Sequence, residues 1–251
     1  MKLRNLILLG ITSFSATAIW NMPATFAYQY LPLKNIQVNQ LTGTIWNGEA
    51  KEIITKQLTL NNISWSVDLL RSMTSLALKS TLEIQDPDIT FKGLAGFNIS
   101  QTVSLDDAQF QTTGAFASKF QKLAKLSGDI KGTIKQFEMA KGELPVLDAN
   151  CQWKQGELIS PMRIRPAGDY SLTIKPSDKG LTANIGSSNA PLELSGDMKI
   201  DKEWKYKTNI KIKAANASGK GTMNIIKMTG IRLEKDGTAI IKQQGQLKAF
   251  Y

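Results

Sequence analysis

Hydrophobic and polar residues alternate with a period of two over most of the chain after residue 36. The clearest stretches are Leu76 to Ile84, Tyr170 to Ile174, Leu192 to Ile200 and Trp204 to Ile212. A period of two places successive side chains on opposite faces of a β-strand, so each strand has one apolar and one polar face. The pattern predicts an antiparallel sheet that is covered on a single side.

Turn-forming residues separate these stretches at short intervals. They occur at Asp86-Pro87-Asp88, Lys141-Gly142, 176–180, 186–189 and Asp236-Gly237. Many short strands joined by hairpins predict a mainly β fold, as a strongly curved antiparallel sheet (a half-pipe), a sandwich-like arrangement or a barrel. The alternation slips between residues 130 and 139, which indicates a β-bulge or a bend between strands.

Two segments break the alternation. Residues 67–73 predict a helical turn, and residues 115–126 place Phe116, Phe120 and Leu123 at helical spacing. We therefore expect one or two short helices. The longer one either packs against the core at one end of the sheet or presents a docking face.

A small polar residue followed by glycine recurs where strands are expected to begin. The four occurrences are Thr42-Gly43, Ser127-Gly128, Ser195-Gly196 and Ser218-Gly219. Their irregular spacing argues against a solenoid with a fixed period. Because glycine in a strand permits a kink or a close approach of two backbones, the repeat predicts a sheet that can curl strongly.

The first thirty residues predict export across a membrane. Lys2 and Arg4 precede a stretch from Leu6 to Ala27 that contains no charged residue, which is typical of an export signal. Cleavage after 16–18 or 25–27 would release a soluble exported protein. Alternatively the stretch stays as one transmembrane helix, because about 20 residues cross a bilayer.

We favour the retained anchor, with Trp20, Tyr28 and Tyr30 at the far membrane interface. Residues 1–27 would then form the cytoplasmic start and the anchor, and residues 28–251 a single β domain. In either case the β domain lies across the membrane from the cytoplasm.

The composition of the chain excludes several classes of function. The chain has no histidine, the commonest general base and metal ligand. Cys151 is the single cysteine, so it cannot form an internal disulfide or a thiolate metal site. The net charge of +10 comes mostly from dispersed lysines, without the arginine-rich stripe of nucleic-acid readers. We expect no catalytic residue, no cofactor, no metal and no nucleic-acid partner.

Few residues of the sequence are candidates for catalysis or ligand binding. Gly43 and Gly48 have the spacing of a phosphate-binding loop, but Glu49 and Ala50 stand where that motif needs lysine and serine or threonine. The aspartates of 86–88 fit a turn, and those at 106–107 a strand-end loop. Arg163 and Arg165 lie two apart on one strand face, either as solvated edge charges or as a contact for an anion or lipid headgroup.

The stretch LTGTIWNGEA (41–50) combines several of these signals. Gly43 would let the strand curl, and Asn47-Gly48 predicts a tight hairpin turn. Trp46 lies on the face opposite Ile45, so both faces are expected to be covered, by the segment near the anchor or by a neighbouring subunit.

Several stretches in order resemble the type II secretion system protein N family. They are LTGTIWNGEA (41–50), ISWSVDLL (63–70), LSGDIKGTI (126–134), LDANCQWKQGEL (147–158), AGDYSLTI (167–174) and PLELSGDMKI (191–200). The motif positions, to which we assign structural roles, are Gly43, Trp46, Gly48, Trp65, Gly128, Trp153, Gly168, Tyr170 and Gly196.

The resemblance implies an accessory component of the machine that exports folded proteins from the periplasm through the outer membrane. It would be anchored in the inner membrane through residues 6–27 and would contact other subunits of the secretion system. The family is also similar to AsmA-like proteins, whose curved sheets have an apolar groove suited to lipid acyl chains. A periplasmic lipid- or hydrophobe-binding protein is therefore the alternative function.

Overall fold

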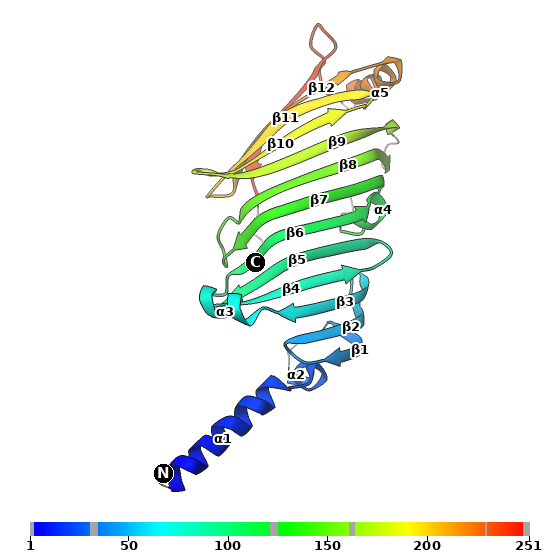
Figure 1. The fold of residues 1–251 in the computed structure, drawn as a ribbon. Coiled ribbons are helices and arrows are strands. Elements are labelled where there is room, and N and C mark those ends of the chain that lie inside the picture. Colours follow the sequence, from blue (N-terminus) through cyan, green and yellow to red (C-terminus); the bar gives the residue numbers. More distant parts are fainter. Residues whose placement is uncertain (1–2, 31–34, 121–124, 161–163, 229, 248–251) are drawn as a thin grey trace.

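The computed structural model describes residues 3–30, 35–120, 125–160, 164–228 and 230–247. These residues form one open antiparallel sheet of 13 strands, and each strand pairs with its neighbours in sequence. The strands are β1 (Gln37–Gly43), β2 (Asn47–Ile54), β3 (Thr59–Val67), β4 (Ala77–Gln85), β5 (Ile89–Asn98), β6 (Val103–Thr113), β7 (Lys125–Met139), β8 (Val146–Ser160), β9 (Ile164–Ser177), β10 (Gly180–Ser188), β11 (Leu192–Asp201), β12 (Lys205–Ala214) and β13 (Ala239–Gln246). The strand direction turns progressively from β3 to β12 (Figure 1). The single sheet confirms the mainly β prediction and excludes the sandwich.

Helices lie at the two ends of the strands. They are α1 (Leu3–Trp20), α2 (Ala24–Tyr30), α3 (Leu69–Ser75), α4 (Gly114–Ala117) and α5 (Ala217–Met228). Figure 1 shows α3 at one end of the strands, α4 and α5 at the other, and α1 projecting away from the sheet. The described chain thus contains more short helices than the one or two expected.

The predicted transmembrane helix over residues 6–27 is not one continuous helix. α1 ends at Trp20, and α2 begins only after Pro23, whose ring allows a helix to start but not to continue through it. Within the described residues, no helix is both long enough and apolar enough to cross a membrane.

One row of paired positions crosses the entire sheet and contains only apolar side chains and glycine. Its members are Leu41, Ala50, Ile63, Ile84, Phe91, Phe110, Gly132, Cys151, Leu172, Ile185, Gly196, Ile210 and Ile241. We call this set the apolar row. Ala50 and Ile63 are buried, and the other members are half-buried.

The next row along the strands is polar from edge to edge. Its members are Thr42, Glu49, Ser64, Glu83, Lys92, Gln109, Thr133, Asn150, Thr173, Asn184, Asp197, Asn209 and Lys242. Adjacent residues of a strand face opposite sides, so the two rows define an apolar and a polar face. The one-sided strands predicted from the sequence are confirmed.

The most deeply packed apolar cluster of the described residues lies at one end of the apolar face. Met223 of α5 packs with Leu192 and Ala239, which are all at most 7% exposed. Ile212 and Ile226 pack around them. α5 thus covers β11 to β13, while the remaining apolar row is covered mainly by its own neighbours in the sheet.

The position of α5 corrects one prediction. Ser218-Gly219 lies inside α5 rather than at a strand start. Thr42-Gly43 ends β1 and Ser195-Gly196 lies within β11, so only Ser127-Gly128 of the four pairs lies near a strand start. The Asn216 side chain accepts a hydrogen bond from the N–H of Gly219 (3.0 Å) and so begins a helix in place of a strand. A Cβ at Gly219 would clash with the carbonyl of Pro191, so this glycine permits the helix to lie close to the sheet.

The helix predicted over 115–126 is shorter than expected. Thr113 caps α4 by accepting a hydrogen bond from the N–H of Phe116 (3.1 Å), and Phe116 is buried. The chain then returns to the sheet, because residues from Lys125 onward pair with β8. Residues 121–124 lie outside the described chain. By contrast, the helical turn predicted at 67–73 is confirmed as α3.

Bulges interrupt the long strands where the sequence pattern slips. The β7–β8 register shifts between Ile134 and Gln136, within the predicted region 130–139. Asp106 and Asp107 lie inside β6 and not in a loop. Asp107 has a positive φ of 49° where the β5–β6 register shifts. The Asp106 carboxylate accepts a hydrogen bond from the Lys79 ammonium at 2.7 Å, an ion pair that links β4 to β6.

Two methionines of α5 provide a matched test of this packing. Met223→Ala should lower the free energy of unfolding by about 2–5 kcal/mol, because it leaves a cavity against Leu192. Met228→Ala, at a position 86% exposed, should change it by no more than about 0.5 kcal/mol. Urea denaturation followed by circular dichroism measures both. Equal effects of the two substitutions would show that α5 does not depend on this contact.

Candidate functional site

The turn between β1 and β2 holds the segment that follows α1. The backbone N–H of Ile45 donates a hydrogen bond to the carbonyl of Met22 (3.1 Å), and the indole N–H of Trp46 donates to the carbonyl of Ile19 (3.0 Å). The rings of Trp20 and Trp46 stack with their centroids 6.4 Å apart. These contacts determine where α1 leaves the sheet.

Trp65 supports the same turn from β3. Its indole N–H donates to the carbonyl of Ile45 (3.2 Å), and its ring lies over Gly48, its partner in β2. A Cβ at Gly48 would clash with this ring. Gly43 ends β1 with a φ of +82°, and a Cβ there would clash with the backbone of Asn47. Both glycines therefore shape the turn.

The chain reverses at Ile45 and Trp46, and the predicted turn at Asn47-Gly48 is wrong. The N–H of Thr44 donates to the carbonyl of Asn47 (2.8 Å), and the Thr44 hydroxyl accepts from the N–H of Asn47 (3.1 Å). Asn47 and Gly48 are the first residues of β2. The threonine hydroxyl stabilises a local alternative that the Asn-Gly signal does not reveal.

A second aromatic cluster lies in β7 to β9. The indole N–H of Trp153 donates to the carbonyl of Ser127 (2.8 Å), and its ring lies over Gly156. The rings of Trp153 and Tyr170 have centroids 5.4 Å apart. Gly128 has a φ of +91°, and a Cβ there would lie 2.5 Å from a backbone carbonyl oxygen. This cluster stabilises the β-bulges of the central strands.

Gly168 and Gly196 mark two further close approaches. A Cβ at Gly168 would lie 2.6 Å from the Cβ of Ala190, and one at Gly196 would clash with the carbonyl of Asn209. The predicted motif residues thus fall into two clusters, with Gly196 apart from both. Their assignment as family motif residues stays a prediction.

Sequence reasoning missed the recurrence of an aromatic ring over a glycine. Besides Trp65 over Gly48, the ring of Phe110 lies over its partner Gly132, and that of Tyr206 over its partner Gly245. An aromatic side chain can cover the backbone that a strand glycine exposes. Pairs separated by 17 to 39 positions leave no local signal, because they become neighbours only when the strand register is known.

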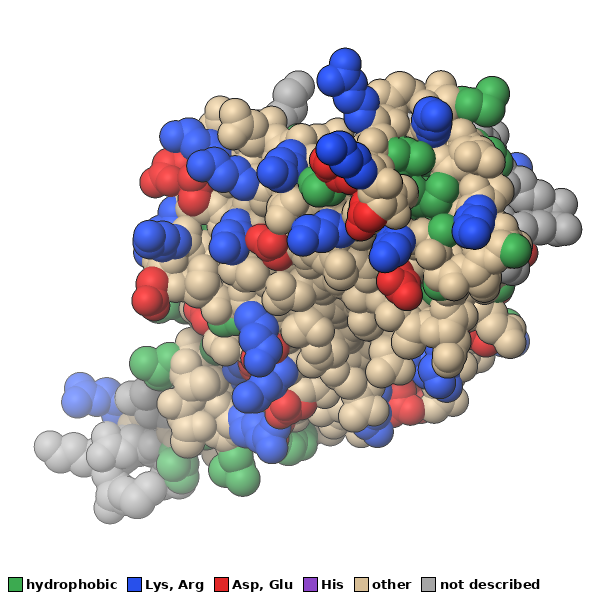
Figure 2. All heavy atoms as spheres, turned by 90° about the horizontal axis from the view of Figure 1, so that it is seen from above, with side chains coloured by type: hydrophobic (Ala, Val, Ile, Leu, Met, Phe, Trp, Pro, Cys, Tyr) green, Lys and Arg blue, Asp and Glu red, His purple; other side chains and the backbone are tan. Residues whose placement is uncertain are grey.

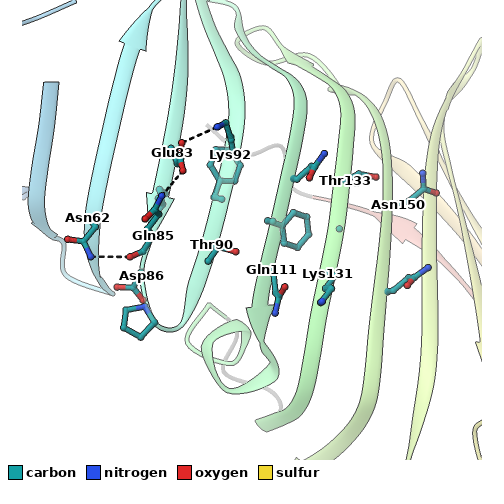
Figure 3. A pocket seen from close by; sticks show the side chains of 17 residues that line it. Asn62, Glu83, Gln85, Asp86, Thr90, Lys92, Gln111, Lys131, Thr133 and Asn150 are labelled. Atoms are coloured by element: carbon teal, nitrogen blue, oxygen red, sulfur yellow. Dashed lines mark hydrogen bonds and ion pairs between the residues drawn. The ribbon is translucent and has the colours of Figure 1, made fainter. Parts of the chain in front are cut away.

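A hollow of about 940 Å³ lies along the sheet between β3 and β8 (Figure 3). Glu83 pairs with Lys92 at 3.2 Å and accepts a hydrogen bond from Gln85 at 2.6 Å. The hydrogen bond from Gln85 lowers the pKa of Glu83 most, and the contact with Lys92 lowers it further. Further polar lining residues are Asn62, Thr90, Gln111, Lys131, Thr133 and Asn150. Ile84, Phe91, Phe110 and Gly132 of the apolar row also line the hollow. Because polar and apolar positions are mixed in its lining, the hollow differs from the apolar groove that the resemblance implies.

The other shifted groups offer little for acid–base chemistry. Burial raises the pKa of the Cys151 thiol and of the Tyr170 phenol. Burial also acts to raise the pKa of Asp86, but hydrogen bonds from Asp88 and Asn61 outweigh it and hold this pKa below its ordinary value. Asp86 stays ionised at neutral pH and ties β3 to the β4–β5 turn.

Positive charge is dispersed over the molecule. Figure 2 shows Lys and Arg side chains interspersed with Asp and Glu over the face seen from above. Arg163 lies outside the described residues, and Arg165 is a residue of β9. Their contact with an anion or a lipid headgroup stays a prediction.

Substitutions at two glycines distinguish the cost of a positive φ from the cost of crowding at the β1–β2 turn. Gly43 and Gly142 have φ of +82° and +80°, but a Cβ meets no atom within 4 Å at Gly142. Gly142→Ala should cost about 1 kcal/mol of unfolding free energy for its φ alone. Gly43→Ala should cost about 1–3 kcal/mol more, because it also forces the backbone of Asn47 to move. Chemical denaturation measures both, and equal losses would contradict the crowding.

Sequence comparison relates this chain to known proteins. Residues 34–240 match the family model described as type II secretion system (T2SS), protein N. The type II secretion system protein N of Pectobacterium carotovorum subsp. carotovorum is 21% identical over 98% of this chain and 100% of its own length. The type II secretion system protein N of Aeromonas hydrophila is 20% identical over 79% of this chain and 81% of its own length. No solved structure matches. Because the family model covers nearly the whole sheet, this chain belongs to the type II secretion system protein N family.

Proposed function

We propose that this protein is a non-enzymatic accessory component of the type II secretion system, held at the inner membrane and supporting the export of folded proteins from the periplasm across the outer membrane. The observation that carries the proposal is the family match over residues 34–240, which reaches from β1 into β13. Both relatives named above carry the name of the same secretion component.

Membrane attachment through residues 6–27 is part of this proposal. In the described part of α1, large apolar side chains are exposed to the surroundings of the protein, Phe14 by 76% and Ile11 by 60%. An apolar helix that is held by the sheet at its end and exposes these side chains suits contact with lipid. The β domain, residues 28–251, would then lie on the periplasmic side.

The half-buried apolar row explains how such a component could act. A row of aliphatic and aromatic side chains along a sheet, bordered by a polar row, offers an extended surface to another secretion subunit. In this function the sheet holds its neighbour through apolar contact and contributes no chemistry of its own.

The same row favours a second candidate function. Lipid acyl chains could also lie along it, so a periplasmic lipid- or hydrophobe-binding role of the AsmA-like type competes with the structural one. The two functions differ in what covers the apolar row in the cell.

Deletion of the gene should leave exported proteins in the periplasm, and the intact chain should restore their secretion. Fractionation and immunoblotting of one secreted enzyme and of one resident periplasmic protein measure this. Normal secretion by the deletion strain would contradict the proposed role in export.

Photo-crosslinking distinguishes the two candidate functions. Phe110→p-benzoylphenylalanine keeps an aromatic ring in the apolar row, and Gln109→p-benzoylphenylalanine is the matched control on the polar face. In secreting cells, position 110 should crosslink to a protein of the secretion system, whereas position 109 should not. Crosslinking of position 110 to lipid alone, identified by mass spectrometry, would favour the lipid-binding function instead.

A further inference from the structure

Exposed apolar side chains gather at one end of the sheet, on α3 and on the strand ends beside it. They are Leu70, Met73, Leu76, Leu78, Phe97 and Ile99, which we call the α3 surface. Ile99 is 96% exposed and Leu76 is 80% exposed. A shallow hollow of about 450 Å³ opens here and is also lined by Trp46. Such a gathering exceeds the isolated apolar residues that are normal on a protein surface.

The fold itself does not account for these side chains. Asp68 begins α3 by accepting a hydrogen bond from the N–H of Arg71 (3.0 Å). Leu76 ends it in the left-handed conformation, with a φ of 51°. Glycine is the favoured residue at such a helix end, because a side chain is strained there. A leucine that is both strained and exposed points to a contact outside the chain.

The exposed apolar side chains are concentrated at the strand ends beside α3. At the opposite ends of the same strands, the turns carry the exposed residues Lys56-Gln57 and Pro87-Asp88. Farther along the end that holds α3, the turns carry Asp178-Lys179 and Lys202-Glu203, which are also exposed. Within the described residues, other strand ends carry single exposed apolar side chains, such as Phe120 and Ile159, whereas the tips beside α3 carry six.

This part of the sheet is also where α1 attaches. Trp46 contributes to the α3 hollow, and its indole binds the carbonyl of Ile19 at the end of α1. Figure 1 shows α1 leaving the sheet near the end at which α3 lies. A bilayer that receives α1 would consequently be close to the α3 surface.

We propose that the α3 surface docks into the periplasmic leaflet of the bilayer that holds α1, with a lipid bilayer as its occupant. The inference rests on the membrane attachment proposed above. Leu70, Met73 and Ile99 enter the boundary between headgroups and acyl chains, where an amphipathic segment inserts by about 5–10 Å. Together with α1, this second contact holds the sheet at a defined tilt to the membrane.

Fluorescence quenching in vesicles tests the proposal on the full chain. Cys151→Ala removes the native thiol, and one NBD reporter is attached after Ile99→Cys, Lys179→Cys or Phe14→Cys. The vesicles contain phosphatidylethanolamine, phosphatidylglycerol and spin-labelled quencher lipids. We expect blue-shifted, quenched emission at position 99 and unquenched emission at position 179, which lies at the same end of the sheet.

The Phe14→Cys reporter separates the two proposals. Quenching at position 14 without quenching at position 99 would overturn the docking and leave the membrane attachment intact, so that a protein partner would cover the α3 surface. Quenching at position 99 alone would support docking and contradict insertion of α1. Quenching at neither position would overturn both.

A charged variant supplies the matched control. Leu70→Glu with Met73→Glu should abolish quenching of the position-99 reporter, because carboxylates disfavour the acyl boundary. Met228→Glu, at a still more exposed methionine on α5, should leave that quenching unchanged. All three positions are at least 76% exposed, so the fold should persist, as checked by circular dichroism. Persistent quenching in the double variant would overturn the assignment of the α3 surface.

Discussion

The strand register is the constraint on which the rest of this structure depends. The apolar row from Leu41 to Ile241 and the polar row from Thr42 to Lys242 differ by one residue in each strand. A slip of one residue in any pairing would bring an apolar side chain to the polar face and a polar one to the apolar face. The bulges of β5 to β9 place extra residues outside the rows and so preserve the register across long strands.

A single layer of sheet leaves its apolar face incompletely covered. α5 packs on β11 to β13, where Met223 and Leu192 are buried, but Phe91 and Leu172 in the middle of the apolar row remain half-buried. A soluble sheet with one apolar face ordinarily packs that face against a second layer. A member of a multi-component secretion system can instead bury it against another subunit or against lipid, which gives the family membership a physical meaning.

The aromatic–glycine contacts connect the fold to the candidate site. Trp65 over Gly48 braces the turn on which Trp46 receives the end of α1, so the direction of the N-terminal helix follows from packing within β1 to β3. The sequence indicated that the segment near the anchor or another subunit would cover Trp46. It could not indicate the carbonyl of Ile19 as the acceptor, because that contact joins residues 27 positions apart.

The sequence by itself determined the one-sided strands, most of their turns, the helical turn before Leu76 and the absence of histidine chemistry, because each depends on local periodicity or composition. Only the tertiary structure decided that one open sheet forms and not a sandwich, since strand order and register are non-local. It also decided that α5 replaces a predicted strand, because the Asn216 side chain accepts a hydrogen bond from the first turn of the helix and Gly219 lets the helix lie close to the carbonyl of Pro191. The tertiary structure likewise decided how far the apolar row and the α3 surface are exposed, because exposure depends on which elements pack against each surface.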